Sequence, residues 1–356
     1  YLIGKRFAYF EQSRGLQNPE TYGAVKKKNT HDALESVLTS LDYSRIMRKP
    51  MILAPKDATG CFDMLRAAAI RSIQESKGMP RGINACRIAV LQNMERHVKT
   101  AGKISSRSIK YSKENTFGGV GIGAGSGPQD SNDQFGVLKD IHAEITPGFT
   151  YQHPSGTEEK SDTRHGPGFI DDQIDITELA TQDAATSLGR GQDTLQVWQN
   201  LLHVSGGDLS LPKCSYGTLQ FKFSYHKNGD TALIKSNDEN PGNISLQPLH
   251  QLLPRVPLKR LAVTAGERYL GIRIAIDGNW NDEFKFRLQK HETLGATIIN
   301  SNISRTQAYM IHSVHFKPAI KYALEHTRFN LTQANYESSR YQLITPCCLK
   351  WGSIEK

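Results

Sequence analysis

The spacing of apolar residues divides the N-terminal part of the chain into a helix and a buried strand. Apolar residues between positions 33 and 41 recur at helical spacing, directly after the polar cluster 29–32, so a helix should begin there. The run "MILA" (51–54) between two prolines predicts a short buried strand. Asp57 would then lie at or just past the end of that strand.

The rest of the chain alternates between helical and strand-like patterns. Helices are predicted at 64–77, 84–96, 131–145, 193–205 and from Asn281 onward, where 304–324 is the clearest. Pairs of strands are predicted at 97–112, at 208–216 with 217–226, and at 259–278, and 146–165 should be a loop or an irregular hairpin. In 131–145 we expect one buried face made of Phe135, Leu138, Ile141 and Ile145. This order predicts an α+β protein with a mainly antiparallel sheet flanked by helices.

Charge and cysteine content narrow the class of protein. A net charge of +9 favours a polyanionic partner such as nucleic acid, although basic proteins without such a partner are also common. The five cysteines are scattered without the spacing of a zinc site, which favours reduced thiols in an intracellular protein, nuclear or cytoplasmic. No apolar run approaches the roughly 20 residues that span a bilayer, so we expect no membrane partner. Because the sequence opens on Tyr1, we expect it to be a fragment of a longer protein.

The stretch "GPGFIDDQID" (166–175) places two carboxylates, Asp171 and Asp172, directly after an apolar pair. Two adjacent negative charges repel each other unless a positive charge lies near, so a bound cation is one hypothesis and a solvated turn is the other. Because neighbouring residues on a strand point to opposite faces, we expect Asp171 to face the cation and Asp172 to point away. Together with Asp57 from the earlier strand, these carboxylates would form a site for two divalent cations that supports phosphoryl displacement.

Five motifs in order carry a family resemblance. "KDATGCFDML", "GVGIGAGSG", "GFIDD", "GGDLSLPKC" and "ERYLGI" resemble the palm motifs of reverse transcriptases, most closely those of non-LTR retrotransposons, and "TYGAVKKKNTHDAL" is similar to the preceding fingers motif. The resemblance implies a right-hand polymerase fold with partial fingers at 1–50, a palm with finger insertions at 51–280 and a helical thumb-like region at 281–356. The palm motifs would lie at 57–63, 119–128, 169–172, 206–214 and 267–272.

The same resemblance implies an activity, its cofactor and its partners. The activity would be RNA-directed DNA polymerisation, a nucleotidyl transfer that uses an RNA template, a DNA primer and deoxynucleoside triphosphates. Asp57, Asp171 and Asp172 would bind Mg²⁺ or Mn²⁺, and Lys213 would protonate the departing pyrophosphate. The alternative for Lys213 is an ordinary surface lysine.

Further positions would bind nucleotide and primer. The resemblance assigns Phe62 to a gate against the ribose 2′-hydroxyl and Lys28 to phosphate binding. It assigns Gly123 and Gly125 to close backbone approach. Tyr269, Leu270 and Gly271 would form a hairpin that holds the primer end. The alternatives are a core phenylalanine, a flexible surface loop and an ordinary strand, respectively, for Phe62, the glycines and the hairpin.

Two departures from the family pattern leave other functions open. Ala124 stands where the family usually has glutamine, and Val25 stands where an arginine is expected. Because polymerisation needs aligned substrates as well as metals, one alternative is a catalytically inactive nucleic-acid-binding remnant of a retroelement. The other is an unrelated structural or interaction protein in which "FIDD" is only a turn.

Overall fold

The computed structural model describes most of the chain, which forms two compact units. The described residues are 2–93, 95–100, 102–109, 127–153, 160–179, 184–225, 232–237, 242–248, 254–327, 329 and 333. The first unit is Tyr1–Leu261 and the second is Ala262–Lys356. The predicted fingers, palm and thumb are defined by their roles in a polymerase and not by compactness, so this division stays a prediction.

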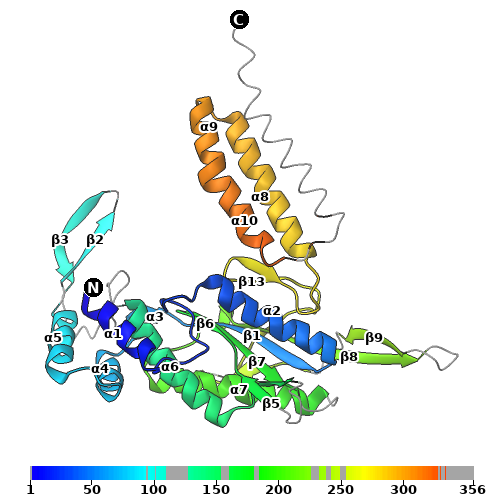
Figure 1. Ribbon diagram of the computed structural model, residues 1–356, viewed down its shortest axis with the longest axis horizontal. Helices are drawn as coiled ribbons and strands as arrows, with labels where there is room; N and C mark the ends of the chain where they lie inside the picture. Colours follow the sequence, from blue (N-terminus) through cyan, green and yellow to red (C-terminus); the bar gives the residue numbers. More distant parts are fainter. Residues whose placement is uncertain are drawn as a thin grey trace, which may run out of the picture. The chain divides into compact units, whose positions relative to one another are not determined.

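A six-stranded sheet is the centre of the first unit (Figure 1). Its order is β12-β8-β1-β7-β6, with β9 paired to β8, and only the β12–β8 pair is parallel. These strands are β1 (Met51–Asp57), β6 (Gly168–Phe169), β7 (Asp172–Glu178), β8 (Ser215–Tyr225), β9 (Ala232–Asn237) and β12 (Lys259–Arg260). The predicted strand at "MILA", its end at Asp57 and the α+β class with a mainly antiparallel sheet are therefore confirmed.

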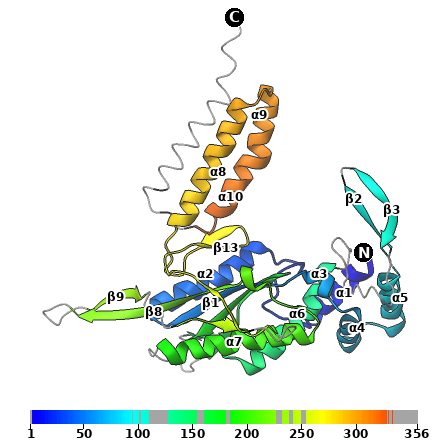
Figure 2. The same ribbon diagram turned by 180° about the vertical axis from the view of Figure 1, so that it is seen from behind.

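Helices cover both faces of this sheet (Figures 1 and 2). On one face lie α6 (Gly127–Ile145) and α7 (Ala184–Val204), and on the other lies α2 (Thr30–Met47). The side chain of Asn29 accepts hydrogen bonds from the backbone of α2 while Asp32 accepts one from Asn29, and this capping box fixes where α2 begins. Trp198 of α7 is 1% exposed and belongs to the main apolar core, as the spacing in 193–205 predicted.

The remaining elements of the first unit are short helices and hairpins. The helices are α1 (Leu2–Ser13), α3 (Cys61–Met64), α4 (Ala67–Ser76) and α5 (Arg81–Gln92). The paired strands are β2 (Arg96–Thr100) with β3 (Lys103–Ile109), β4 (Phe149–His153) with β5 (Lys160–Arg164), and β10 (Ser245–Leu246) with β11 (Val256–Pro257). The hairpin predicted at 97–112 is confirmed within the described residues, and 146–165, predicted as a loop or an irregular hairpin, contains paired strands. The helix predicted at 84–96 begins and ends a few residues earlier.

Two predicted features are wrong. The strand predicted at 208–216 is wrong for 208–214, where Leu211–Lys213 form a 3₁₀ turn, because Pro212 has no N–H to give to a ladder and Ser210 N donates to Asp57 O instead. Its last two residues, 215 and 216, belong to β8. In α6, Phe135 and Leu138 are buried but Ile141 and Ile145 are 42% and 59% exposed. The first half of that helix buries polar side chains instead.

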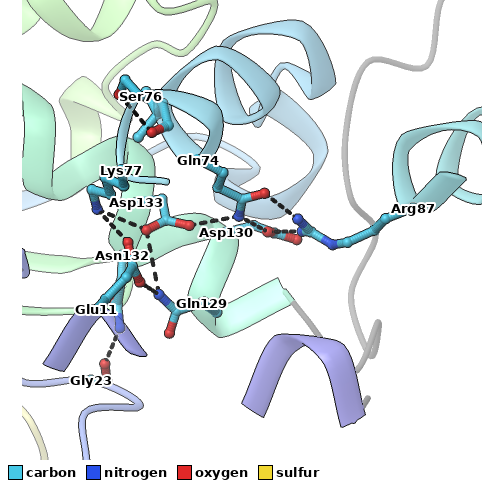
Figure 3. A network of polar contacts seen from close by, with 11 residues as sticks. Glu11, Gly23, Gln74, Ser76, Lys77, Arg87, Gln129, Asp130, Asn132 and Asp133 are labelled. Atoms are coloured by element: carbon cyan, nitrogen blue, oxygen red, sulfur yellow. Dashed lines mark hydrogen bonds and ion pairs between the residues drawn. The ribbon is translucent and has the colours of Figure 1, made fainter. Parts of the chain in front are cut away.

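The buried polar side chains of α6 belong to a network that also includes residues of α1, α4 and α5 (Figure 3). We call it the α6 polar network; its members are Glu11, Gln74, Lys77, Arg87, Gln129, Asp130 and Asp133. Lys77 Nζ lies 2.8 Å from Glu11 Oε1 and 2.9 Å from Asp133 Oδ1, and Gln74 Nε2 donates to Asp133 Oδ2 (2.6 Å). Arg87 pairs with Asp130, and Gln129 donates to Glu11. The network holds the start of α6, the helix that follows the glycine-rich segment.

The second unit contains a small hairpin and three helical segments. They are β13 (Glu267–Tyr269), β14 (Ile272–Ile274), α8 (Asn281–Asn300), α9 (Arg305–Ile311) and α10 (Lys317–Leu324), with a π-helical turn at His312–Phe316 between the last two. The predicted helix start at Asn281 and the helix at 304–324 are confirmed. Within the described ranges of both units, no helix combines the length and the apolar character that a bilayer crossing requires.

Candidate functional site

Asp57 and Asp172 face each other at the end of the β1–β7 ladder. They are the last pair of Cα partners in the register, and directly opposed residues on antiparallel strands project to the same face. Asp171 lies in the turn between β6 and β7, next to Ile170, whose φ is +60°. The prediction that Asp172 points away from the site is therefore wrong, because the hairpin turns at Ile170 and Asp171 and strand alternation begins only at Asp172.

The "GGDLSLPKC" segment is held directly against Asp57 by backbone hydrogen bonds. Thr59 N donates to Asp208 O (2.8 Å), Ser210 N donates to Asp57 O (2.8 Å), and Ala58 bridges to Leu209. This attachment brings together two motifs that lie about 150 residues apart in the sequence. It also fixes the backbone from which Lys213 extends.

Lys213 supplies the positive charge next to the carboxylates. Its Nζ lies 2.8 Å from Asp57 Oδ2, and its side chain is 68% exposed while that of Asp57 is 24% exposed. The hydrogen bond to Asp57 and the charge of that carboxylate raise the pKa of Lys213, and the charges of Asp171 and Asp172 raise it further. Lys213 is thus a cation at neutral pH, within the field of all three aspartates.

The N-terminal loop 20–23 packs against the aspartate turn, which sequence reasoning did not foresee. Tyr22 N donates to Gly168 O (2.8 Å), and Gly168 N donates to Glu20 O (2.9 Å), so the loop extends the sheet edge at β6. A Cβ on Gly23 would lie 2.5 Å from Ile170 Cγ1 and 2.7 Å from Ile170 N. Gly23 therefore allows the loop to reach the turn that carries Asp171.

A buried ion pair lies on the opposite face of the same strand ends. Lys56 Nζ is 2.5 Å from Asp175 Oδ2 and 3.8 Å from the Trp198 ring centroid, and both charged side chains are less than a tenth exposed. Burial lowers the pKa of Lys56 to about 8, against the opposing effect of Asp175. The sequence pattern did not indicate this pair, because Gln173, Asp175 and Thr177 alternate with Ile174 and Ile176 and so resemble the solvated face of a strand.

Phe62 and Lys28 have identified contacts. Phe62 in α3 is half-buried and packs against the main apolar core. The Lys28 ammonium donates to Pro19 O (2.5 Å) and Thr21 O (3.0 Å) and lies 4.7 Å from the Tyr22 ring centroid. Burial lowers the pKa of Lys28. The gate role and the phosphate-binding role remain predictions, and Lys28 also holds the loop against which the turn packs.

The other predicted residues belong to the second unit or lie outside the described residues. Gly123 and Gly125 lie outside the described residues. Tyr269, Leu270 and Gly271 form the β13–β14 turn of the second unit, where Tyr322 Oη donates to Leu270 O (2.7 Å) and Arg287 Nη2 donates to Gly271 O (2.7 Å). Helices α8 and α10 thus hold this turn, and its primer-binding role stays a prediction.

The aspartate cluster has the donor chemistry of a Mg²⁺ or Mn²⁺ site. Carboxylate oxygens are the ligands these ions prefer. Within the described part of the chain, however, Asp57, Asp171 and Asp172 do not form a set whose ligand atoms all lie within 4.8 Å of one another. Lys213 Nζ contacts Oδ2 of Asp57, one of the two oxygens of that carboxylate, so a cation bound there would share the carboxylate with this ammonium or displace it.

Comparison with known proteins gives only a weak likeness. No protein-family model matches the sequence, and no curated protein matches it. Among solved structures, the telomerase of Candida tropicalis in complex with the TWJ fragment of telomeric RNA is similar at 9% identity and a TM-score of 0.46. The match covers 99% of this chain and 47% of that one, so this chain spans about half the length of the telomerase chain. A likeness at this level identifies neither the family of the chain nor its activity.

Proposed function

We propose that this chain is a template-directed nucleotidyltransferase of the reverse-transcriptase type, with a right-hand polymerase fold. The observation that carries the proposal is the meeting of three sequence motifs at one place. Asp57 and Asp172 share one face at the strand ends, Asp171 lies in the adjoining turn, and Lys213 pairs with Asp57. If the turn at Asp171 were only a solvated turn, there would be no reason for Asp57 and Lys213, from two other segments, to lie beside it.

In this proposal Asp57, Asp171 and Asp172 hold the divalent cations. Bound there, Mg²⁺ or Mn²⁺ would lower the pKa of an attacking hydroxyl and stabilise charge on phosphate oxygens. The chain's own residues orient the site: Ser210 fixes the Asp57 backbone, and the loop at Gly23 supports the turn. The nearby carboxylates raise the pKa of Lys213 and so keep its ammonium protonated. This ammonium would donate a proton to the leaving pyrophosphate.

The remaining roles follow the same proposal. Phe62 would limit the space beside the sugar, and Lys28, Gly123 and Gly125 would contact the incoming nucleotide. Tyr269, Leu270 and Gly271 would hold the end of a DNA primer paired with an RNA template.

Primer extension tests the proposal. The purified chain is given an RNA template, a labelled DNA primer, deoxynucleoside triphosphates and Mg²⁺ or Mn²⁺. We expect extension that Asp57→Asn lowers by at least about 100-fold, because each carboxylate stabilises charge in the transition state. Asp193→Asn, at an exposed position of α7, is the matched control and should retain full extension. Extension that survives Asp57→Asn would refute the assignment of this site.

The second candidate function is binding of nucleic acid without catalysis. It is favoured by the ion pair between Lys213 and Asp57, which neutralises a carboxylate without any metal. In that case the chain binds an RNA–DNA hybrid with strong salt dependence, and no extension occurs with either ion.

A further inference from the structure

The segment that leads into the aspartate turn is held at one residue, Gly166, by two side chains of opposite charge. The N–H of Gly166 donates to Glu20 Oε1 (3.0 Å), and its carbonyl oxygen accepts from the ammonium of Lys139. The neighbouring N–H of His165 also donates to the Glu20 carboxylate, at 3.0 Å to Oε1 and 3.2 Å to Oε2. We call Glu20, Lys139 and Gly166 the Gly166 clamp.

The two charged members of the clamp come from segments far from Gly166 in the sequence. Glu20 belongs to the N-terminal loop and is half-buried, and Lys139 belongs to helix α6 and is 7% exposed. Charges in such surroundings require partners, and both find one in the backbone of Gly166. Burial lowers the pKa of Lys139 and the charge of Glu20 opposes that shift, so the two side chains also act on each other.

The position of Gly166 affects the turn that follows it. Its φ is +116°, and a Cβ there would collide with Ile174 O, so only glycine fits between the clamp and β7. Directly after Gly166 the chain runs along β7, where Ile174 N donates to Pro167 O (3.1 Å). A shift of Gly166 would therefore move the hairpin that carries Asp171.

The loop that carries Glu20 is itself held by Lys28. The Lys28 ammonium donates to the carbonyl oxygens of Pro19 and Thr21, on either side of Glu20. The backbone oxygen of Glu20 accepts from Gly168 N (2.9 Å), so both the backbone and the side chain of Glu20 bond to the segment before the turn. Glu20 thus connects the lysine proposed to contact the nucleotide with the turn proposed to hold the cations.

We propose that Glu20 and Lys139 are positioning residues of the metal site, which fix the aspartate turn by holding Gly166 from two sides. The inference rests on the proposed nucleotidyl transfer and adds two residues that would contact neither the cations nor the substrates. Without the Glu20 carboxylate, two backbone N–H groups lose their acceptor and the buried Lys139 ammonium loses a nearby opposite charge. The turn would then shift, and its carboxylates would bind cations less tightly.

Hydrogen–deuterium exchange of the full chain tests whether the clamp fixes the turn. Glu20→Ala removes the acceptor, whereas Glu20→Gln keeps an acceptor oxygen without the charge. We expect exchange across 165–175 to accelerate by about tenfold in Glu20→Ala, the effect of losing one hydrogen bond to a charged group, and by less in Glu20→Gln. Ile88→Ala, which truncates a buried side chain of α5, is the matched control, since it destabilises the fold without touching the clamp. Exchange at 165–175 that is the same in Glu20→Ala as in Ile88→Ala would overturn the proposal.

Mn²⁺ binding, measured by electron paramagnetic resonance, and primer extension connect the clamp to the metal site. We expect Glu20→Ala and Lys139→Met to weaken Mn²⁺ binding and to lower kcat, while KM for the primer–template stays unchanged. Ile88→Ala should alter none of these values. Because both side chains hold one residue, the double variant should lose less Mn²⁺ affinity than the two single losses combined.

The outcomes separate the clamp from the proposed function. Faster exchange at 165–175 together with normal Mn²⁺ affinity would overturn the positioning role while the nucleotidyl transfer stands. If the unaltered chain neither binds Mn²⁺ nor extends a primer, the proposed function fails, and the exchange rates still decide whether Glu20 holds the turn.

Discussion

Asp57 and Asp172 form the final cross-strand pair of the β1–β7 ladder, with both side chains on the same face of the sheet. Directly opposed like charges destabilise a ladder unless a positive charge lies near, and here Lys213 provides it. Asp172 therefore occupies a position at the strand ends equivalent to that of Asp57.

This pairing predicts that Asp172 contributes as much to the binding of Mn²⁺ as Asp171 does. We expect Asp172→Asn to weaken Mn²⁺ binding by about tenfold or more, since each carboxylate is a charged ligand. Electron paramagnetic resonance of free Mn²⁺ measures the loss. If Asp171→Asn abolishes binding while Asp172→Asn binds normally, the shared face has no role in metal binding. Asp193→Asn is the control.

Lys213 should compete with the metal for Asp57. Replacement by methionine removes the ammonium but keeps the length of the side chain, so we expect Lys213→Met to bind Mn²⁺ more tightly than the unaltered chain. The stability of the fold should change little, because exposed ion pairs contribute about 0–1 kcal/mol. In extension assays the same variant should be slower, because the proposed proton donor is lost. Weaker Mn²⁺ binding would contradict the competition.

Gly23→Ala should destabilise the aspartate turn. The added methyl group would meet backbone and side-chain atoms of Ile170 at less than 3.0 Å, and such overpacking costs about 1–3 kcal/mol. Urea denaturation measures the loss. Gly189→Ala in helix α7 is the matched control, since no atom lies within 4 Å of the new Cβ and alanine favours a helix interior. A Gly23→Ala chain as stable as the control would show that the loop does not support the turn.

The α6 polar network predicts that stability depends on pH. Burial, with a hydrogen bond and repulsion from Asp133, raises the pKa of Glu11 from 4.5 to about 8, although Lys77 opposes the shift. Among the described residues of this network, three carboxylates (Glu11, Asp130 and Asp133) face two cations (Lys77 and Arg87), so one retained proton balances the charges.

A raised carboxyl pKa favours the folded state fully below pH 4.5, and this contribution is lost as pH rises towards 8. The free energy of unfolding should therefore fall over that interval, and Glu11→Gln should flatten the dependence. Urea denaturation at several pH values measures both, with Glu144→Gln as the exposed control. A Glu11→Gln chain with the same pH dependence as the control would refute proton retention at Glu11.

The sequence predicted those helices and strands whose formation depends on residues close together in the chain. The cap at Asn29 gave the start of α2, the run "MILA" gave β1, and the apolar spacing around Trp198 gave α7. In each case the residues that decide the structure lie within a few positions of one another.

Features that depend on distant partners were not predictable in this way. The polar half of α6 has the pattern of a solvated face, and it is buried because Glu11, Lys77 and Arg87 reach it from three other helical segments. The same holds for the site. Asp57 and the two following aspartates were identified, but the support from Gly23 and the ion pair Lys56–Asp175 join segments more than 100 residues apart.

The ion pair between Lys213 and Asp57 also bears on what happens when catalysis is lost. In a metal site whose carboxylates depend on the ion for charge balance, these carboxylates repel one another when the ion is absent. Here the exposed side chain of Lys213 provides a positive charge next to Asp57, so the charge of this carboxylate is balanced without a metal ion. Because an exposed ion pair adds little to the stability of the fold, selection for folding alone would not preserve these aspartates once selection for activity had ended.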